Sequence, residues 1–285
     1  MRFRNHLVGL ASLVILTQAC GEGAPEGGEI RTPEGPEAEG RAILERSAEA
    51  HGGLQTFRAI RSWRIVARRE GRTIPVGEIY EEYIQNAGTI QTLLIKRQPG
   101  TVLTYLHDGQ EGYSLVDGRL LEDAGAAEEA YYRAHGEYYL RALPFKWLDP
   151  GVSHRLVGRE TVRGTPALLV EIQAEEGVGD AWQDTWTAVI DSNSHLLIEG
   201  RLEHYPPQFG QGPVDPEART TSQITYRYSD YRQVDGLRIP FVMEYVSGDE
   251  VTGENVIQEI ELDLGLDPEL FTPEAHRVRA PDSEV

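Results

Sequence analysis

Histidines, acidic residues and one cysteine are the side chains of this sequence that could do chemistry. The eight histidines are scattered along the 285 residues, whereas metal sites usually show at least one close pair of ligands. The nearest candidate pairs, Glu203–His204 and His107–Asp108, are chain neighbours, so in a strand their side chains point to opposite faces. We therefore expect no metal site and no cofactor.

Acidic pairs such as Glu81–Glu82 and Glu175–Glu176 reflect the acidic composition, and nothing marks one carboxyl as a general acid. The sequence has no Gly-x-Ser-x-Gly, His-Glu-x-x-His or phosphate-loop motif. We interpret Asp180 and Asp184 as turn residues and His135 as a packed or rim histidine. These observations predict a protein without catalytic residues, and a hydrolase or metalloenzyme is the less favoured alternative.

The net charge excludes one class of partner. With 46 acidic and 27 basic residues, the formal charge is −19. Nucleic acid is excluded because its binding depends on Lys and Arg neutralising phosphates. General electrostatic adhesion to an anionic membrane is disfavoured for the same reason. The acidic surface is explained by solubility.

The first 20 residues have the pattern of an export signal. Arg2 and Arg4 precede an apolar run over residues 7–16, and Thr17-Gln-Ala-Cys20 follows. This predicts a signal peptide over residues 1–19, since the run is about half of the ~20 residues that cross a bilayer. Cys20, the only cysteine, resembles the acylated cysteine of a bacterial lipobox, although Thr17 and Gln18 depart from its commonest pattern. The resemblance implies lipidation of Cys20, by palmitate or similar chains, and membrane anchoring. An ordinary cleaved signal with an incidental cysteine is the alternative.

The composition divides the chain into a tether, one domain and a tail. Residues 20–40 are rich in Gly, Glu and Pro and cannot build a core, so we expect a flexible acidic tether. One domain is expected over residues 41–275, with a polar tail over 276–285. A loop rich in Pro and Gly is expected at Tyr205–Arg219.

Alternating apolar and polar residues predict strands through most of the domain. The clearest example is 223–264, where three runs are separated by turns at Asp235-Gly236 and Ser247-Gly248-Asp249. We count roughly eleven to thirteen strands. The exception is the segment 124–143, in which Tyr131, His135, Tyr138 and Ala142 share one predicted helical face before Pro144 ends the helix.

The 13 Tyr, 4 Trp and 6 Phe suggest what the sheet encloses. Tyrosine hydroxyls need a partner or water, so a tyrosine-rich concave face favours a partly wet cavity over a filled core. Both interpretations remain open at this point. The inward-facing candidates for ligand contact are Trp63, Ile65, Leu93, Ile95, Tyr226, Phe241, Met243 and Tyr245. The candidates for a lid over them are Tyr131, Tyr138 and Phe145.

Several motifs, taken in their order along the chain, resemble a known family. They are His51-Gly-Gly53 with Phe57, Ile60 and Ser62; Leu143-Pro-Phe-Lys-Trp-Leu-Asp-Pro150; Ile190-Asp191 with Leu196-Leu197; Tyr228 with Tyr231 and Val234-Asp-Gly236-Leu-x-Ile-Pro240; and Leu266-Asp-Pro-Glu-Leu-Phe271. Together they resemble the LolA/LolB-like periplasmic and outer-membrane lipoprotein carriers, including their uncharacterised lipoprotein branch. The resemblance implies a mainly β fold: one antiparallel, strongly curved half-open barrel of about eleven strands, with helices covering the open side.

The resemblance also implies a function. We expect an anchored, non-catalytic envelope lipoprotein that binds a lipid or a lipoprotein acyl chain in its cavity. The alternative is an envelope sensor or assembly scaffold that binds a polypeptide partner. Gly21 after Cys20 resembles the sorting signal for the outer membrane, so we expect the protein there, facing the periplasm.

Overall fold

The computed structural model describes residues 35–72, 74–86, 88–123, 125–179, 182–205 and 222–278. They lie within one compact unit that spans Pro33–Val285. The expected signal peptide, Cys20 and all but the first residue of the expected loop Tyr205–Arg219 lie outside the described residues. None of the described helices is long and apolar enough to cross a membrane.

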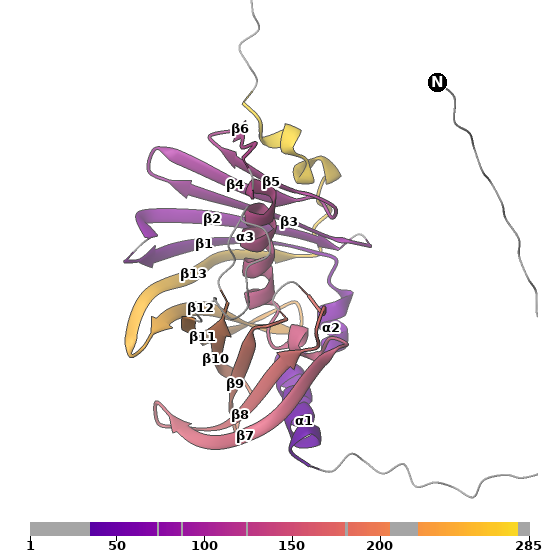
Figure 1. Cartoon of the computed structure of the whole chain (residues 1–285), viewed down its shortest axis with the longest axis vertical. Coiled ribbons are helices and arrows are strands. Elements are labelled where there is room, and N and C mark those ends of the chain that lie inside the picture. Colours follow the sequence, from indigo (N-terminus) through magenta and orange to yellow (C-terminus); the bar gives the residue numbers. More distant parts are fainter. Residues whose placement is uncertain are drawn as a thin grey trace, which may run out of the picture. The chain divides into compact units, whose positions relative to one another are not determined.

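A single antiparallel sheet dominates the described residues (Figure 1). Its thirteen strands are β1 (Ser62–Gly71), β2 (Ile74–Asn86), β3 (Ile90–Gln98), β4 (Thr101–His107), β5 (Gly112–Val116), β6 (Arg119–Leu120), β7 (Val152–Val162), β8 (Thr165–Ala174), β9 (Thr185–Asp191), β10 (Leu197–His204), β11 (Ser222–Val234), β12 (Leu237–Ser247) and β13 (Glu250–Leu262). The expected curved antiparallel fold is confirmed, with thirteen strands rather than about eleven. One reason for the difference is that β6 has two residues, too few to show any alternation.

The strand order explains why a helix crosses the sheet. In space the strands run β6-β5-β4-β3-β2-β1-β13-β12-β11-β10-β9-β8-β7. The chain therefore builds one half outward to β6, restarts at the far edge with β7, and returns until β13 pairs with β1. The connection between the two edges contains α3 (Ala126–Arg141) and the 3₁₀ helix η1 (Phe145–Leu148). In Figure 1 the sheet curves around α3.

Two N-terminal helices and a C-terminal segment complete the fold. The helices are α1 (Pro36–Ala50) and α2 (Leu54–Ala59), and the segment forms η3 (Pro268–Phe271) and η4 (Pro273–His276). Helix α1 begins five residues before the expected start of the domain, with a proline in its first turn, where a missing N–H is tolerated. Helix α1 packs closely on β7: a Cβ on Gly40 would lie 2.9 Å from the Arg155 nitrogen.

The first and fourth family motifs meet in space. His51 follows α1 and is buried, and its Nδ1 donates to the Ser47 carbonyl at 2.7 Å. Its Nε2 lies 3.3 Å from the Tyr231 hydroxyl of β11. Gly52, with φ of 111°, lies against Gly236, where a Cβ would lie 2.3 Å from the carbonyl oxygen. The glycine is therefore required both by its backbone conformation and by the close approach of two chain segments.

Candidate functional site

Most of the predicted ligand contacts lie in one filled core. Ile65, Tyr226, Phe241 and Met243 belong to a single buried cluster, which also contains Phe145, and Tyr245 packs against it. Helix η1 contributes Trp147 and Leu148 to the same cluster. These side chains come together as predicted, but they contact one another and η1. Their contact with a ligand stays a prediction.

Leu93 and Ile95 lie on the opposite face of the sheet. The neighbouring Thr92 faces α3, because its hydroxyl contacts His135 Nδ1 at 3.1 Å. Since side chains alternate along a strand, Leu93 and Ile95 point away from α3. They form a second buried cluster with Leu106 and Phe271, the latter from η3. The expectation that they face inward with Trp63 is therefore wrong, because the C-terminal segment buries the outer face as well.

Helix α3 presents a different face to the interior than the one predicted. Its buried residues are Ala126, Ala130, Ala134, Glu137 and Arg141. The predicted face, containing Tyr131 and Tyr138, is only half-buried. The small alanines allow close approach to β3, β4 and β5. Size rather than aromatic character therefore decides which face of this helix turns inward.

Several charged side chains are buried between α3 and the sheet. Arg69 Nη1 of β1 lies 3.4 Å from Glu137 Oε1 of α3 and 3.7 Å from Glu78 Oε1 of β2. Arg141 Nε lies 4.0 Å from Glu82 Oε2, and both side chains are at most 2% exposed. Three elements thus place five ionisable groups where the resemblance implies an apolar cavity. Lys96 of β3 is also buried, and the charges of Arg69, Glu137 and Glu78 act on it. We call these six residues, Arg69, Glu78, Glu82, Lys96, Glu137 and Arg141, the interior charge cluster.

Hydroxyl and amide groups extend this cluster. Arg141 and the Asn255 side-chain amide both donate to the hydroxyl of Tyr80, which is fully buried. Arg69 Nη2 donates to the Tyr245 hydroxyl at 3.2 Å. The hydroxyl of Tyr245, one of the predicted cavity residues, therefore has a protein group as its partner.

Burial and the neighbouring charges shift the pKa values of residues in the interior charge cluster. Burial raises the pKa of Glu82 to about 8, against the opposing effect of Arg141. Burial lowers the pKa of Lys96 to about 8, and Arg69 adds to this effect. Burial alone would raise the pKa of Glu137, but Arg69, Lys96 and Arg141 together hold it below its usual value. Glu82 is therefore mostly neutral at pH 7, whereas Glu137 carries a charge.

Several polar atoms of the cluster have no hydrogen-bond partner among the described residues. They are both carboxyl oxygens of Glu82, Glu137 Oε2, Arg69 Nε, Arg141 Nε and Nη1, and Asn255 Oδ1. Unpartnered buried polar atoms cost free energy, so this attachment of α3 is weaker than its number of charges suggests.

A second polar chain ties α3 to the other half of the sheet. Asp184 Oδ2 accepts from His204 Nδ1 at 2.8 Å, and His204 Nε2 lies 2.9 Å from the Tyr132 hydroxyl of α3. Asp184 Oδ1 also accepts the backbone N–H of Tyr205 at 2.9 Å. Both Asp184 and His204 are buried. Asp184 directly precedes β9, and its carboxylate also orients the His204 ring through their hydrogen bond.

The described histidines do not converge into a metal site. His107 and His135 have ring centroids 4.9 Å apart, and Tyr131 stacks on His135 at 4.1 Å. No group of three or more His, Cys, Asp or Glu among the described residues could hold a metal ion. His135 is thus the packed rim histidine that the sequence predicts.

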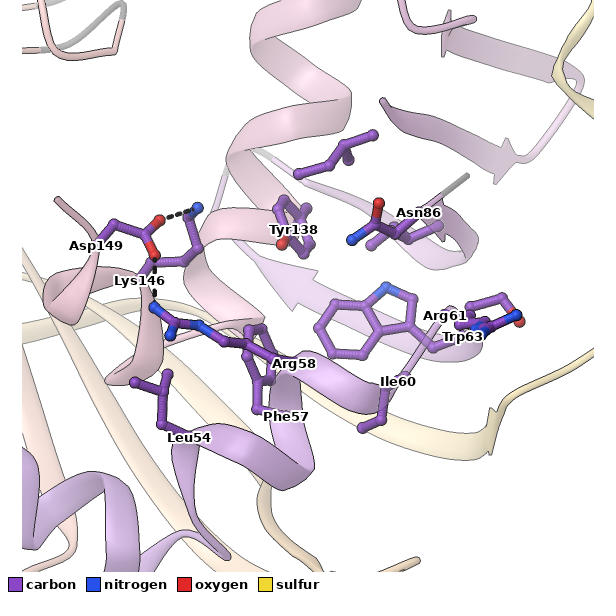
Figure 2. Close-up of a pocket in the computed structure, with 13 residues that line it drawn as sticks. Leu54, Phe57, Arg58, Ile60, Arg61, Trp63, Asn86, Tyr138, Lys146 and Asp149 are labelled. Carbon is purple, nitrogen blue, oxygen red and sulfur yellow. Dashed lines mark hydrogen bonds and ion pairs between the residues drawn. The ribbon is translucent and has the colours of Figure 1, made fainter. Parts of the chain in front are cut away.

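One accessible pocket lies among side chains of α2, β1, β2 and α3 (Figure 2). This pocket has a volume of about 190 Å³. Its apolar wall consists of Leu54, Phe57, Ile60, Trp63, Ile84, Ile90 and Tyr138. Trp63 packs edge-on against both Phe57 and Tyr138, with centroid distances of 6.3 and 5.7 Å. Two predicted residues, Trp63 and Tyr138, therefore do line a pocket together.

The remaining pocket residues are polar. They are Arg58, Arg61, Ser62, Asn86, Lys146 and Asp149. Asp149 pairs with Lys146 and lies 3.9 Å from Arg58. The sequence contained signals for this site that the prediction missed: Phe57 and Lys146 both lie inside the family motifs, but only as markers of the fold.

The comparisons with known proteins address the fold. No protein-family model matches the chain, and no curated protein matches it significantly. A DUF1329 family protein from Desulfovibrio piger has a similar structure, with a TM-score of 0.53 and 13% identity over 86% of this chain and 100% of that chain. A putative outer membrane lipoprotein-sorting protein domain from Vibrio parahaemolyticus has 11% identity over 83% and 97%, with a TM-score of 0.49. A LolA superfamily protein from Nitrosomonas europaea has 10% identity over 83% and 98%, also with a TM-score of 0.49.

At such identities a likeness shows the fold and not the ligand. The match to the D. piger structure extends over that whole chain. It agrees with the observed topology, a single antiparallel sheet curved around a crossing helix. The chain therefore shares with the D. piger structure a mainly β fold with one curved, half-open antiparallel sheet, which is the fold class expected from the sequence.

Proposed function

We propose that the protein is a non-catalytic binding protein of the bacterial cell envelope that holds a lipid or acyl chain in its half-barrel. The proposed binding site is the pocket between α2, β1, β2 and α3. One observation carries the proposal. An aromatic wall of Phe57, Trp63 and Tyr138 borders a hollow at the side of the sheet that the helices cover.

The chemistry of the wall suits an amphipathic ligand. Trp63 is 4% exposed, and its indole Nε1 is a buried donor with no hydrogen-bond partner among the described residues. A ligand oxygen would relieve the cost of leaving this donor unpaired. The apolar side chains around it would bury a hydrocarbon chain, at ~25 cal/mol per Å² before the costs of association.

The size of the pocket limits what it holds. At about 190 Å³ it is smaller than typical ligand sites of ~300–1,000 Å³. It therefore takes part of a single chain in the observed state. A ligand reaches Tyr226, Phe241 and Met243 only after η1 or α3 moves, because these side chains are buried in the cluster that η1 completes.

Lipid extraction tests the proposal. All forms tested carry Cys20→Ser, which removes the expected anchor, so that they can be purified without detergent. Bound lipids are then extracted and identified by mass spectrometry. The variant Ile90→Trp fills the pocket, since Ile90 lines it and is half-buried. Val76→Trp is the matched control, because Val76 is 88% exposed and lies outside the pocket. Lipid bound to the wild type and to Val76→Trp but lost from Ile90→Trp supports the proposal, and equal lipid in both variants argues against this pocket.

We also propose that acyl chains on Cys20 anchor the protein to the outer membrane. The support is the lipobox-like sequence and Gly21. Cells are labelled with radioactive palmitate and their membranes are fractionated. The wild type should carry label in the outer-membrane fraction, whereas Cys20→Ser should carry none. Label in the inner membrane alone would contradict the sorting half of this proposal.

One observation favours the alternative, a polypeptide partner. Strand β7 has a sheet neighbour on one side only, so its other edge could pair with an added strand. Helix α1 approaches this strand at Arg155, which restricts access to part of the edge. Crosslinking from Arg159→Cys, on the exposed part of β7, would trap a peptide partner in cells if the alternative holds.

A further inference from the structure

The pocket of the proposed function has an uneven distribution of charge. Three basic side chains and one acidic side chain line it, which gives a net charge of +2. The whole chain has a formal charge of −19. A basic site in such an acidic protein is not explained by solubility, and it would attract an anion.

Two of the three basic side chains, Arg58 and Lys146, lie together. They come from different elements, α2 and η1, and share the single carboxylate of Asp149. The Arg58 side chain is 47% exposed, and its Nη2 lies 3.9 Å from Asp149 Oδ1, too far for a hydrogen bond. The Arg58 guanidinium therefore keeps its donors available for a second anion.

Arg61, the third basic residue, differs from this pair. Its guanidinium has no hydrogen bond or ion pair to any described residue, but its backbone N–H donates to Asp263 Oδ1 at 2.7 Å. This contact is made by the backbone of Arg61 and not by its guanidinium, so Arg61 does not converge with Arg58 and Lys146 on one carboxylate. In Figure 2, Arg61 lies beside Trp63, whereas Arg58 extends toward Lys146 and Asp149.

We propose that this pocket selects amphiphiles with an anionic head group, carboxylate or phosphate, and that Arg58 and Lys146 bind that group while the wall at Phe57, Trp63 and Tyr138 holds the chain. The inference rests on the proposed function and names its ligand class. The two parts of the ligand match two parts of the site, since Arg58, Lys146 and Asp149 lie together at one side of the aromatic wall (Figure 2).

The test compares single-chain probes that differ only in the head group. Dodecanoate, dodecyl phosphate, dodecanol and dodecylamine are titrated into the purified protein at pH 7.5, and binding is measured by calorimetry. We expect the two anions to bind roughly tenfold more tightly than dodecanol, which is the size of one charge-assisted hydrogen bond at a partly exposed site. Dodecylamine should bind most weakly. Inorganic phosphate alone should not compete with dodecanoate, because it lacks the chain.

Two variants locate the selectivity. Arg58→Gln should remove the preference for anions, so that dodecanoate and dodecanol bind with similar affinity, and it should fold because exposed ion pairs contribute little stability. Arg61→Gln, which removes the same charge elsewhere in the pocket, should keep the preference within about twofold.

Each outcome separates this inference from the proposed function. Equal binding of dodecanol and dodecanoate would overturn the head-group selection but leave the binding pocket in place. A preference that survives Arg58→Gln but disappears in Arg61→Gln would overturn the assignment to Arg58 and Lys146. Competition by inorganic phosphate at the affinity of dodecanoate would indicate a site for free anions. If none of the four probes binds, the proposed function itself fails.

Discussion

Replacing Glu82 with glutamine should change how stability depends on pH between 7 and 9. Burial raises the pKa of Glu82 from 4.5 to about 8, so the folded protein holds a proton that the unfolded chain releases at lower pH. Stability is then present below pH 4.5 and is lost as the pH rises through 8. Lys96 acts in the opposite direction, because burial lowers its pKa from 10.5 to about 8. The folded protein loses that proton earlier than the unfolded chain, so stability rises with pH from about 8 upward.

The two effects nearly cancel in the wild type. From pH 7 to pH 9 each of these two groups changes the free energy of unfolding by about 1 kcal/mol. Glu82 lowers the free energy of unfolding, and Lys96 raises it by a similar amount. The wild type should therefore show little net change from this pair. Glu82→Gln should gain about 1 kcal/mol over the interval, and Lys96→Met should lose about as much.

Urea unfolding followed by circular dichroism measures both variants at pH 7 and pH 9. Glutamine resembles the protonated carboxyl, so Glu82→Gln should fold and differ from the wild type by less than about 1 kcal/mol at pH 7. Glu81→Gln is the matched control, since Glu81 has a lowered pKa and titrates below this interval. If Glu82→Gln shows the same change from pH 7 to pH 9 as the wild type, Glu82 is not a buried neutral acid, and the assignment is refuted.

Three further predictions concern parts of the fold away from the charge cluster. Burial lowers the pKa of His51 from 6.5 to about 4. Acidification from pH 7 to pH 4 should therefore lower the free energy of unfolding by about 3 kcal/mol through this group. In denaturant titrations at the two pH values, the wild type should lose that much more stability than His51→Gln. Phe271→Ala should destabilise by about 3–5 kcal/mol in urea unfolding because it empties the second cluster, and a loss below about 1 kcal/mol would show that this cluster is not packed. Gly52→Ala should lower the melting temperature, because φ is 111° and the new Cβ would lie 2.3 Å from the Gly236 carbonyl; an unchanged melting temperature would contradict this packing.

The fold could be predicted from the sequence because sheet patterns are local. Alternation of side chains has a period of two, so each strand reveals its two faces without knowledge of its neighbours. The segment 223–264 illustrates this: its three runs became β11, β12 and β13, with Tyr226 paired to Tyr245 as successive hairpins require. The turn signal at Asp235-Gly236 and the order of the family motifs supplied the remaining evidence for the fold.

The candidate site could be predicted only in part. Trp63 and Tyr138 were identified from aromatic patterns and do line the pocket. Arg58 and Lys146 were not identified, because they are distant in the chain and only the packing of α2 against η1 brings them to the same carboxylate. Leu93 and Ile95 were assigned to the wrong face, because alternation says that a strand has two faces but not which one lies inside.

The sequence by itself determined that this chain forms successive antiparallel strands with a helix between them, since alternation, turns and helical periodicity act over a few residues. The curvature of the sheet was implied only by the resemblance of the motifs to a known family. Only the tertiary structure decided what fills the half-barrel. The alanines of α3 let the helix approach closely, and this approach places Glu137 and Arg141 against Glu82 and Arg69. Glu82 was one acidic residue among many in the sequence, and its partner Arg141 comes from α3, far along the chain. Burial and long-range partners set the charge state of such a group, and both exist only in the folded protein.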